Sequence, residues 1–549
     1  MDFYAALSLL RMLVLDTGAS WVRMFIALGI SIILSLILGI YAAISERFGR
    51  IIIPIVDIFQ TLPILAFFPI VIVVFVGILP GYIGINAAVI FLIITSMIWN
   101  IIFGVYESVI VLPSEVMEMA ELYGLSTWQR FKKIFIPASM PRVVQQSILS
   151  WSIGLFYLVT SEIFSTGVSQ YKVTYGIGVF FGTIGSSNLA EYLLGIAVFI
   201  VFVIATRLLF FKPLENYFSR YSRQQSTSAG YLRIHNIVHA PIRFIRKRVT
   251  GPTRIQDMGI RIGRVILKPR LKKNEPKPIY VKRKSRTGSR TKYATAAILL
   301  AVLIILLYLY PQILPYEYII IVNLAFSFAR VWFAFLVALA ISIPVCVYLI
   351  FMTRQTSKYV LLFQIIASIP ATILLPLIVA PLSAYQYGAE YTAFIVFFLS
   401  SIWYIIFSAL GASKAIPNSI DEVKNIFGVR GKEAWQKIYL KAIMPGLITG
   451  AVTAIAAEWN ASIVAEFFNG SGNISSAICP SITSLSAISH FTGSGNAVSL
   501  GIGKLLDISL SCNNITLMLI AIVNLSVMII LINIFVWKRL YNKTSAIYR

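Results

Sequence analysis

The chain has 549 residues, of which 58% are hydrophobic and 12% charged, and its mean hydropathy is +0.85. These values exclude a soluble globular protein and predict an all-α integral membrane protein, because several apolar runs exceed the roughly 18 to 20 residues that cross a bilayer. The net charge of +25 raises the question of nucleic acid, but 22 of the 46 Lys and Arg residues lie between Lys212 and Lys292. A basic loop beside membrane helices is typical of a cytoplasmic loop, so no nucleic-acid partner is expected.

The first repeat of spans begins after a short segment with charges. Residues 1–20 include Asp2, Arg11 and Asp16, and we expect them to lie at the membrane interface. Arg47 and Arg50 follow the first span and indicate its cytoplasmic end, which places the N-terminus outside. The predicted spans of the first half are 22–43, 51–78, 85–106, 143–164 and 190–211, and the second of them is expected to be bent or interrupted around Pro63 and Pro69.

A basic linker, residues 212–292, separates a first unit, 1–211, from a second, 293–549. Two interpretations of the linker remain. It is either an amphipathic stretch on the inner leaflet, where membrane lipids would attract it by about 1 kcal/mol per basic residue, or a solvated tether. His235 and His239 are four residues apart without a third ligand nearby, so no metal site is expected.

The second unit repeats the first. Arg23 and Pro63 match Arg330 and Pro370 at an offset of 307 residues, and past a three-residue deletion the offset becomes 304. This regularity indicates an internal duplication. An additional span, 294–314, restores the orientation that five spans reverse, so the two repeats are parallel. The later spans are expected near 326–351, 359–381, 388–410, 446–466 and 514–537, which gives about 11 in total with the C-terminus inside.

A polar helix–glycine–helix insert interrupts the apolar pattern in both repeats. Residues 118–137 read EMAELYGLSTWQRFKKIFIP, and residues 422–441 repeat the spacing. Gly124 is placed to end the first helix in the left-handed conformation, and Pro137 to end the second. A polar insert used twice in a membrane protein suggests two docking sites for a soluble partner.

The first insert resembles the cytoplasmic coupling loop of ABC importer permeases. The pattern rests on Glu118, Ala120, Gly124, Ile134 and Pro137, and in the second copy on Glu422, Gly428 and Ile438. The second copy departs more, because Val423 and Lys424 replace alanines and Lys441 replaces the proline. The two loops are therefore not expected to be equivalent. Both halves look most like permeases of the nitrate, taurine and sulfonate type.

The resemblance implies a function and a set of partners. Two ABC ATPase subunits would bind the two loops, and an extracytoplasmic solute-binding protein would deliver a small anion such as nitrate, sulfonate or bicarbonate for import. The chain would lie in the plasma membrane, with its C-terminus and central linker in the cytoplasm.

The chain itself offers no ATP-binding motif. The nearest run, GSGNAVSLGIGKLL, has Leu505 where a P-loop requires Ser or Thr. We therefore expect a transport subunit without catalytic residues or a cofactor, with ATP used by separate chains. The alternative is an ATP-independent secondary transporter or channel, which requires ionisable residues along its path; the predicted spans contain few.

Matched carboxylates and prolines are the candidates for pathway or gating residues. Glu162 and Glu466 lie at the outer ends of matched spans and are expected either to bond to the glycine-rich segments that follow or to face water at the rim. The prolines are expected to break helices near the centre of the bundle, which leaves backbone amides to line a path or simply kinks the helices. They are Pro63, Pro69, Pro370 and Pro376.

Two cysteines fall in the external segment 467–512 of the second repeat. Cys479 and Cys512 are the candidates for a disulfide, whereas Cys346 lies in a span and is expected to pack there. The segment is longer than its counterpart in the first repeat. It is either a contact surface for the binding protein or a tolerated insertion.

Overall fold

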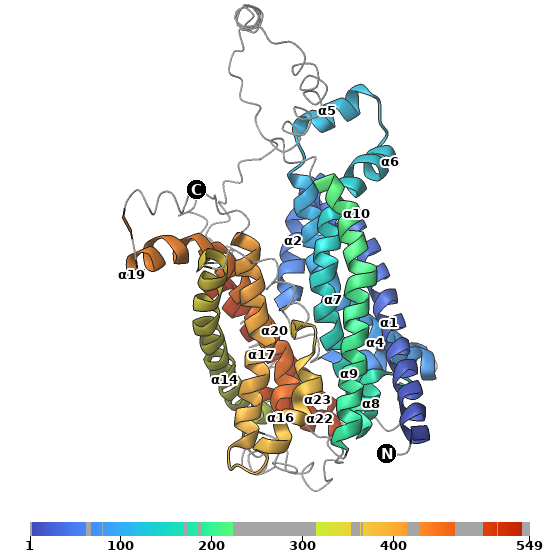
Figure 1. Cartoon of the computed structure of the whole chain (residues 1–549), viewed down its shortest axis with the longest axis vertical. Helices are drawn as coiled ribbons and strands as arrows, with labels where there is room; N and C mark the ends of the chain where they lie inside the picture. Colours follow the sequence, from blue (N-terminus) through green and yellow to red (C-terminus); the bar gives the residue numbers. More distant parts are fainter. Residues whose placement is uncertain are drawn as a thin grey trace, which may run out of the picture.

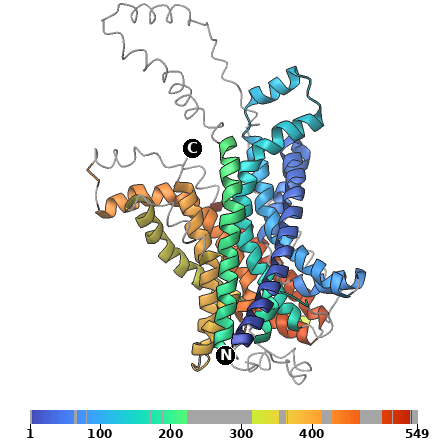
Figure 2. The same ribbon diagram turned by 45° about the vertical axis from the view of Figure 1, so that its right-hand side comes forward.

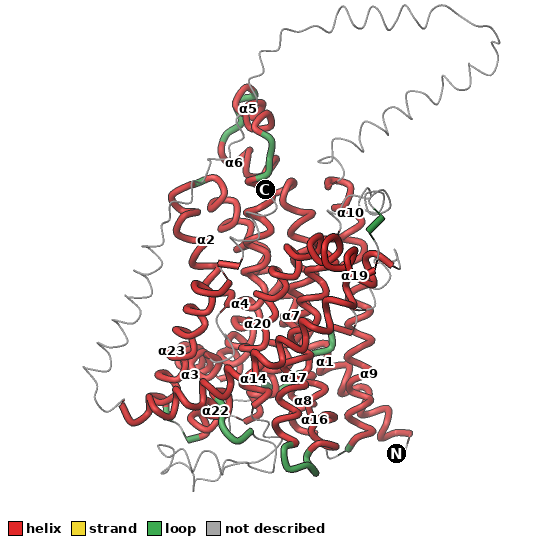
Figure 3. Tube along the Cα trace, turned by 90° about the vertical axis from the view of Figure 1, so that its left-hand side faces the viewer, coloured by secondary structure: helices red, strands yellow, loops and turns green. Residues whose placement is uncertain are grey.

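The chain folds into a bundle of long helices. The computed structural model describes residues 3–61, 67–79, 81–167, 173–184, 188–222, 314–352, 363, 366–413, 428–429, 431–466, 498–512, 514–537 and 539–540. Helices and short connections make up these residues, and no strand occurs among them (Figure 3). The all-α class predicted from the composition is thereby confirmed for the described part of the chain.

The helices of the first repeat follow the order of the predicted spans. They are α1 (Phe3–Ile44), α2 (Glu46–Thr61), α3 (Phe68–Ile78), α4 (Gly81–Ile110), α5 (Ser114–Leu122), α6 (Thr127–Arg130), α7 (Ile136–Gly167), α8 (Ile177–Ile184), α9 (Leu189–Ala205) and α10 (Lys212–Ser222). Two π-helical turns join neighbours without a break: η2 (Phe131–Phe135) between α6 and α7, and η3 (Thr206–Phe211) between α9 and α10.

The second repeat has the same kinds of element in the same order. Its described helices are α14 (Leu314–Val347), η5 (Tyr348–Met352), α16 (Ala371–Leu382), α17 (Gly388–Ser413), α19 (Gly431–Ala434), η6 (Trp435–Tyr439), α20 (Leu440–Glu466), α22 (Ile502–Ser511), α23 (Ile515–Ile532) and η8 (Asn533–Trp537). The π turns η2 and η6 occupy matched positions, 304 residues apart.

Eight described helical stretches are long and apolar enough to cross a membrane, four in each repeat. They account for eight of the predicted spans. The predicted crossing 51–78 is divided between α2 and α3, which agrees with the interruption expected around Pro63 and Pro69, and the one at 359–381 is represented by the shorter apolar helix α16. The additional span predicted at 294–314 lies outside the described residues, except for Leu314 at the start of α14.

Residues 3–20, expected to form an interfacial segment, are part of the single helix α1 and continue directly into the first span. The charge of Asp16 suggested a position outside the membrane. In the structure the side chain is buried, and its carboxylate accepts a hydrogen bond from the backbone of Gly176, which lies 160 residues away. A tertiary contact of this kind compensates the burial of a polar group and is invisible to local pattern reasoning.

Pro137 does not end a helix as predicted. Residues 127–163 form one continuous helix through it. The π turn η2 precedes the proline, and the backbone N–H of Ile136 bonds to the carbonyl of Phe131, five residues back. This wider turn accommodates the proline ring, which clashes with the carbonyl four residues earlier in a regular α-helix. The second repeat keeps the π turn and also continues, with Lys441 at the matched position.

The other prolines differ in their roles. Pro69 lies in the first turn of α3 and Pro370 is the N-cap of α16, so both start helices. Pro376 lies inside α16 and does not break it, contrary to the prediction. Pro63 lies outside the described residues.

The two repeats each bury their own apolar core and meet along a shared face. In the first repeat α4 packs against α1 and α7, and in the second α17 packs against α14 and α20. Between repeats, Tyr192 of α9 donates a hydrogen bond to the carbonyl of Ile373 in α16 at 2.7 Å. Ser152 of α7 lies 3.3 Å from Ser368, oxygen to oxygen. The start of α16 and the residues just before it thus contact the first repeat.

Different features occupy the two ends of the bundle. Helices α5 and α6 project beyond the transmembrane bundle at the top of Figure 1, and the same projection is visible after rotation in Figure 2. The short helices α8 and α22 lie at the opposite end, α8 beside the start of α1 (Figure 1).

Candidate functional site

The projecting insert of the first repeat is a compact pair of capped helices. Helix α5 ends at Leu122, and Gly124 has φ 62°, the left-handed conformation predicted for it. The N–H of Gly124 bonds to the carbonyl of Glu121 at 2.9 Å, and the N–H of Leu125 bonds to that of Ala120 at 2.9 Å. These two bonds form a Schellman motif, which explains why glycine stands at this position.

The second helix of the insert begins with a complete capping box. The Ser126 hydroxyl accepts from the N–H of Gln129 at 3.3 Å, and the Gln129 side chain accepts from the N–H of Ser126 at 2.9 Å. Arg130 then reaches back across the turn, donating to the carbonyl of Leu125 at 2.9 Å and lying 3.4 Å from the carboxylate of Glu121. The angle between α5 and α6 is therefore fixed by side chains as well as by the backbone.

The insert buries one small residue and exposes several large apolar ones. Ala120 is only 2% exposed, whereas Leu122 and Tyr123 are 86% and 82% exposed. Trp128, also exposed, stacks on Phe131 with ring centroids 5.5 Å apart. Glu118 is exposed beside them, and Ile134 is partly buried against the core of the first repeat. An apolar patch that projects from the bundle and is rimmed by charge is typical of a protein-binding surface.

The second insert shares the backbone features of the first where it is described. Gly428 also has φ 62°. The helix then starts differently, because Gly431 has φ 58° where the first repeat has Thr127. Ile438 lies in the π turn η6, partly buried, whereas Glu422 lies outside the described residues.

At the opposite end, a buried ion pair ties α1, α7 and α8 together. This first polar network comprises Ser20, Arg23, Glu162 and the backbone of Ile177 and Gly178. Arg23 Nη1 lies 2.6 Å from Glu162 Oε1, and neither side chain is more than 6% exposed. The other oxygen of Glu162 accepts from the N–H of Gly178 at 2.8 Å. The Ser20 hydroxyl donates to Glu162 and accepts from the N–H of Ile177 at 2.9 Å.

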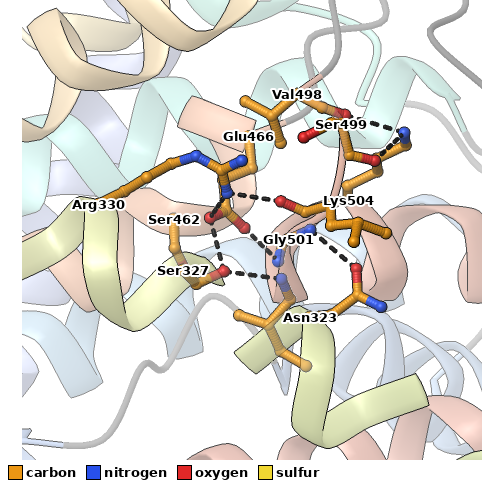
Figure 4. A network of polar contacts seen from close by, with 12 residues as sticks. Asn323, Ser327, Arg330, Ser462, Glu466, Val498, Ser499, Gly501 and Lys504 are labelled. Carbon is orange, nitrogen blue, oxygen red and sulfur yellow. Dashed lines mark hydrogen bonds and ion pairs between the residues drawn. The ribbon is translucent and has the colours of Figure 1, made fainter. Parts of the chain in front are cut away.

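The second repeat contains the same arrangement, drawn in Figure 4. This second polar network comprises Ser327, Arg330, Glu466 and the backbone of Ile502 and Gly503. Glu466 accepts from Ser327 at 2.6 Å, from Arg330 at 3.2 Å and from the N–H of Gly503 at 2.7 Å. Ser327 accepts from the N–H of Ile502 at 2.8 Å. Both networks thus hold the N-terminus of a short helix against two long ones.

The glycines of the two Gly-Ile-Gly segments are required by close approach. A Cβ added to Gly178 would lie 2.6 Å from the carbonyl oxygen of Val159, and one added to Gly503 would lie 2.2 Å from that of Ser462. A Cβ on Gly176 or Gly501 would lie within 2.7 Å of the buried carboxylate. Each carboxylate therefore sits directly against the segment that it bonds.

The two networks differ in where their charges stand. Arg23 donates to Asn86 at 2.7 Å. Asn86 is matched by Glu390, to which Arg330 donates two bonds at 2.6 and 2.8 Å. Conversely, Asp16 of the first repeat is matched by Asn323, which accepts from the N–H of Gly501 at 2.8 Å. The two repeats therefore form similar hydrogen bonds but have their additional carboxylates at different positions.

Lys504 is an additional cation of the second network, and Val179 is its match in the first repeat. Its amine is buried and donates to the carbonyls of Val498 and Ser499 at 2.9 and 3.0 Å (Figure 4). Lys504 lies on α22, outside the eight candidate spans. Burial first, and then the charge of Arg330, lowers the pKa of its ammonium group to about 8.

The structure shows contacts within each repeat between residues that the sequence had related only as matched positions of the two repeats. The prediction that Glu162 and Glu466 bond to the following glycine-rich segments agrees with the distances above. Their arginine partners were noticed only as a matched pair. Ser20 and Ser327 were missed, although they share the offset of 307 residues that matched the arginines. Cys512 is disulfide-bonded, and its predicted partner Cys479 lies outside the described residues.

Comparison with known proteins finds the same family in both halves. The family model of binding-protein-dependent transport system inner membrane components matches residues 35–220 and 357–537. A putative ABC transporter permease protein of Methanocaldococcus jannaschii is 25% identical over 27% of this chain and 54% of its own length. A glycine betaine transport system permease protein of Bacillus subtilis is 29% identical over 27% of the chain and 53% of its own length.

A nitrate import permease protein of Leptolyngbya laminosa is 28% identical over 20% of the chain and 38% of its own length. The chain thus spans about half the length, or less, of the curated relatives it matches. Because the two segments that match the family model make up more than half of the 549 residues, the chain belongs to the family of binding-protein-dependent transport system inner membrane components.

Proposed function

We propose that the chain is the membrane-spanning permease of an ABC importer, with both permease halves fused in one polypeptide. The observation that supports this most directly is the α5–α6 insert, a rigid, capped pair of helices with exposed Leu122, Tyr123 and Trp128. The same glycine conformation recurs at Gly428 in the second repeat. An ATPase subunit docked on each insert would push on α7 or α20, since each insert continues into that helix through a π turn.

The polar networks would act at the other end of the same two helices. Glu162 and Glu466 are near the ends of α7 and α20, so a movement of either helix displaces the segment that the carboxylate holds. We infer that the networks link the coupling inserts to the extracytoplasmic mouth, where a solute-binding protein would dock. This placement assigns the inserts to the cytoplasm and fits a plasma-membrane location.

The substrate is proposed to be a small solute with a negatively charged group. The names of the relatives include nitrate, an anion, and glycine betaine, which contains a carboxylate and a quaternary ammonium group. The proposal of an anion such as nitrate, sulfonate or bicarbonate is retained, with betaine-like zwitterions as the competing class. Uptake competition between the two classes separates them.

The docking proposal is tested by purifying the tagged chain from native membranes in mild detergent. Gly124→Val combined with Gly428→Val forces a branched side chain into two left-handed positions and should abolish recovery of a P-loop ATPase. The matched control is Gly29→Val, at an exposed helical glycine with open space around its Cβ. Loss of the ATPase in the control as well, or its retention in the double variant, contradicts docking on the inserts.

A further inference from the structure

An unpaired carboxyl group lies buried inside the second repeat. Glu458 is in α20 and is 0% exposed, and among the described residues only the Ser401 hydroxyl approaches its carboxylate, without a hydrogen bond of good geometry. It is eight residues before Glu466, or about 12 Å along the helix, and therefore lies nearer the middle of α20 than the second polar network does. An ionised carboxylate in such a place requires a counter-charge or several hydrogen bonds.

The first repeat shows which way this side chain points. Residue 154, matched to Glu458 at the offset of 304, is glycine. A Cβ added to Gly154 would lie 2.2 Å from the Cε atom of Met97 and 3.2 Å from that of Met24. The methionines therefore fill the space that a side chain at 154 would need.

In the second repeat the large residue is at the matched position on α20, and its neighbours are small. The residues matched to Met97 and Met24 are Ser401 and Val331, which are smaller and fully buried. The smaller residues leave room for a side chain at 458, on the sides where α17 and α14 meet α20, and Ser401 of α17 is beside the carboxyl group. The carboxyl group thus lies within the packed interior of one repeat, at a position that the first repeat fills with apolar side chains.

The local hydrogen bonds favour a carboxyl that donates. The Ser401 hydroxyl lies within reach of the carboxyl group and also 3.1 Å from the carbonyl of Phe398. When the hydroxyl donates to that carbonyl, its oxygen can only accept from the carboxyl group. A protonated Glu458 supplies an O–H donor for the Ser401 oxygen, whereas an ionised Glu458 can only accept and would compete with Phe398 for the one Ser401 proton.

Several charged groups on the helices that pack against α20 have partners of their own. Arg330 of α14 is held by Glu390 of α17 and by Glu466 itself, and Lys504 of α22 by two carbonyls. Glu317 of α14 bonds to Asn524, and the Glu46–Arg50 pair of α2 is exposed. The remaining titratable groups on these elements are Tyr316, Tyr318, Cys346, Tyr391, Tyr404, Lys437, Tyr439 and Asp507, with Arg47 and Asp57 on α2.

We propose that Glu458 is a proton-binding site of the second repeat, occupied in this conformation by one proton that the carboxyl donates to Ser401. The first repeat has no such site at the matched position. Loss of the proton places an uncompensated charge between α17 and α20 and loosens their packing, so the second repeat alone senses proton concentration at this depth. The proposal is independent of the substrate and of ATPase docking.

Infrared difference spectroscopy of the purified chain against Glu458→Gln tests the protonation directly. The glutamine keeps a donor toward Ser401 and the volume of the carboxyl group. At neutral pH the wild-type minus variant spectrum should contain the carbonyl band of a protonated carboxylic acid. A difference spectrum with only carboxylate bands overturns the proposal.

The pH dependence of unfolding provides a second, independent measurement. The native chain binds one proton that the unfolded chain releases above about pH 4.3, the ordinary glutamate value. Stability therefore falls as pH rises, and the unfolding equilibrium constant should rise by about tenfold per pH unit relative to Glu458→Gln. Glu458→Gly combined with Ser401→Met restores the pair of the first repeat and should follow the glutamine profile. Parallel profiles of wild type and Glu458→Gln overturn the proposal.

Discussion

At the residue scale, the chain shows how a duplicated site keeps its geometry while its charges change places. Both repeats use a serine, an arginine and a glutamate to hold a Gly-Ile-Gly segment. The carboxylate of Asp16 in the first repeat has no charged match in the second, where Glu390 and Lys504 are added instead. Because each replacement is a hydrogen-bonding side chain of similar reach or an apolar one with its own packing, the backbone need not move.

Removing the cation from either network should destabilise the fold strongly. Arg23→Met leaves Glu162 buried without its counter-charge, and Arg330→Met leaves Glu466 in the same state. We expect a loss of about 3 to 5 kcal/mol in the free energy of unfolding, measured by denaturant titration in detergent. Arg50→Met, which breaks an exposed pair, is the control and should cost about 0 to 1 kcal/mol. Equal effects for the buried and the exposed arginine would contradict the assignment.

The close approach at the glycines gives a second prediction at this scale. Gly178→Ala places a Cβ 2.6 Å from the carbonyl oxygen of Val159, so α8 must shift. Overpacking of this kind should lower the free energy of unfolding by about 1 to 3 kcal/mol, read from the same titration. Gly29→Ala, with nothing near its Cβ, should be neutral or stabilising. If the two variants behave alike, the fit around Gly178 is looser than described.

At the scale of elements, the π turns explain why proline spacing misled the prediction of helix ends. A proline in a regular helix interior removes a hydrogen bond and clashes with the preceding turn. The π turn at 131–135 absorbs that clash, so the insert and α7 remain one rod through Pro137. Because the matched turn at 435–439 precedes Lys441, the turn does not depend on the proline.

The capping box at the start of α6 should be measurable in isolation. Ser126→Ala removes the acceptor for the N–H of Gln129 and should cost about 1 kcal/mol of local stability. The expected result is faster hydrogen exchange in the peptide containing residues 126–130, with α4 unchanged. The mild alternative Ser126→Thr keeps the acceptor and should leave exchange near the wild-type rate. Unchanged exchange in the alanine variant would show that the cap does not hold α6 in place.

At the scale of the whole molecule, the sequence predicted the duplication, most spans and the inserts, because each is a local pattern or a constant offset. The interruption of 51–78 between α2 and α3 was expected from Pro63 and Pro69, whereas the continuous α1 was not predictable in this way. Asp16 is tolerated inside α1 through the backbone of Gly176, and the two methionines beside Gly154 are matched by the smaller Ser401 and Val331 in the repeat that has Glu458. Such compensations appear only when distant segments are brought together.

The inequality of the two inserts leads to a prediction for the assembled complex. The first insert has a complete capping box, whereas the second has Gly431 in the left-handed conformation at the start of its helix. We expect Gly124→Val alone to reduce ATPase recovery more than Gly428→Val alone, with native mass spectrometry reporting the number of ATPase subunits bound. Equal losses would show that the two inserts contribute equally.

The central claim, that this chain is the permease of an ABC importer, is tested most directly by solute uptake into proteoliposomes containing the purified complex. The account predicts inward transport of a labelled small solute that requires ATP, the co-purifying ATPase and a solute-binding protein, and that stops in the Gly124→Val, Gly428→Val double variant. Uptake by the chain alone, driven by an ion gradient and indifferent to ATP, would contradict it and favour a secondary transporter.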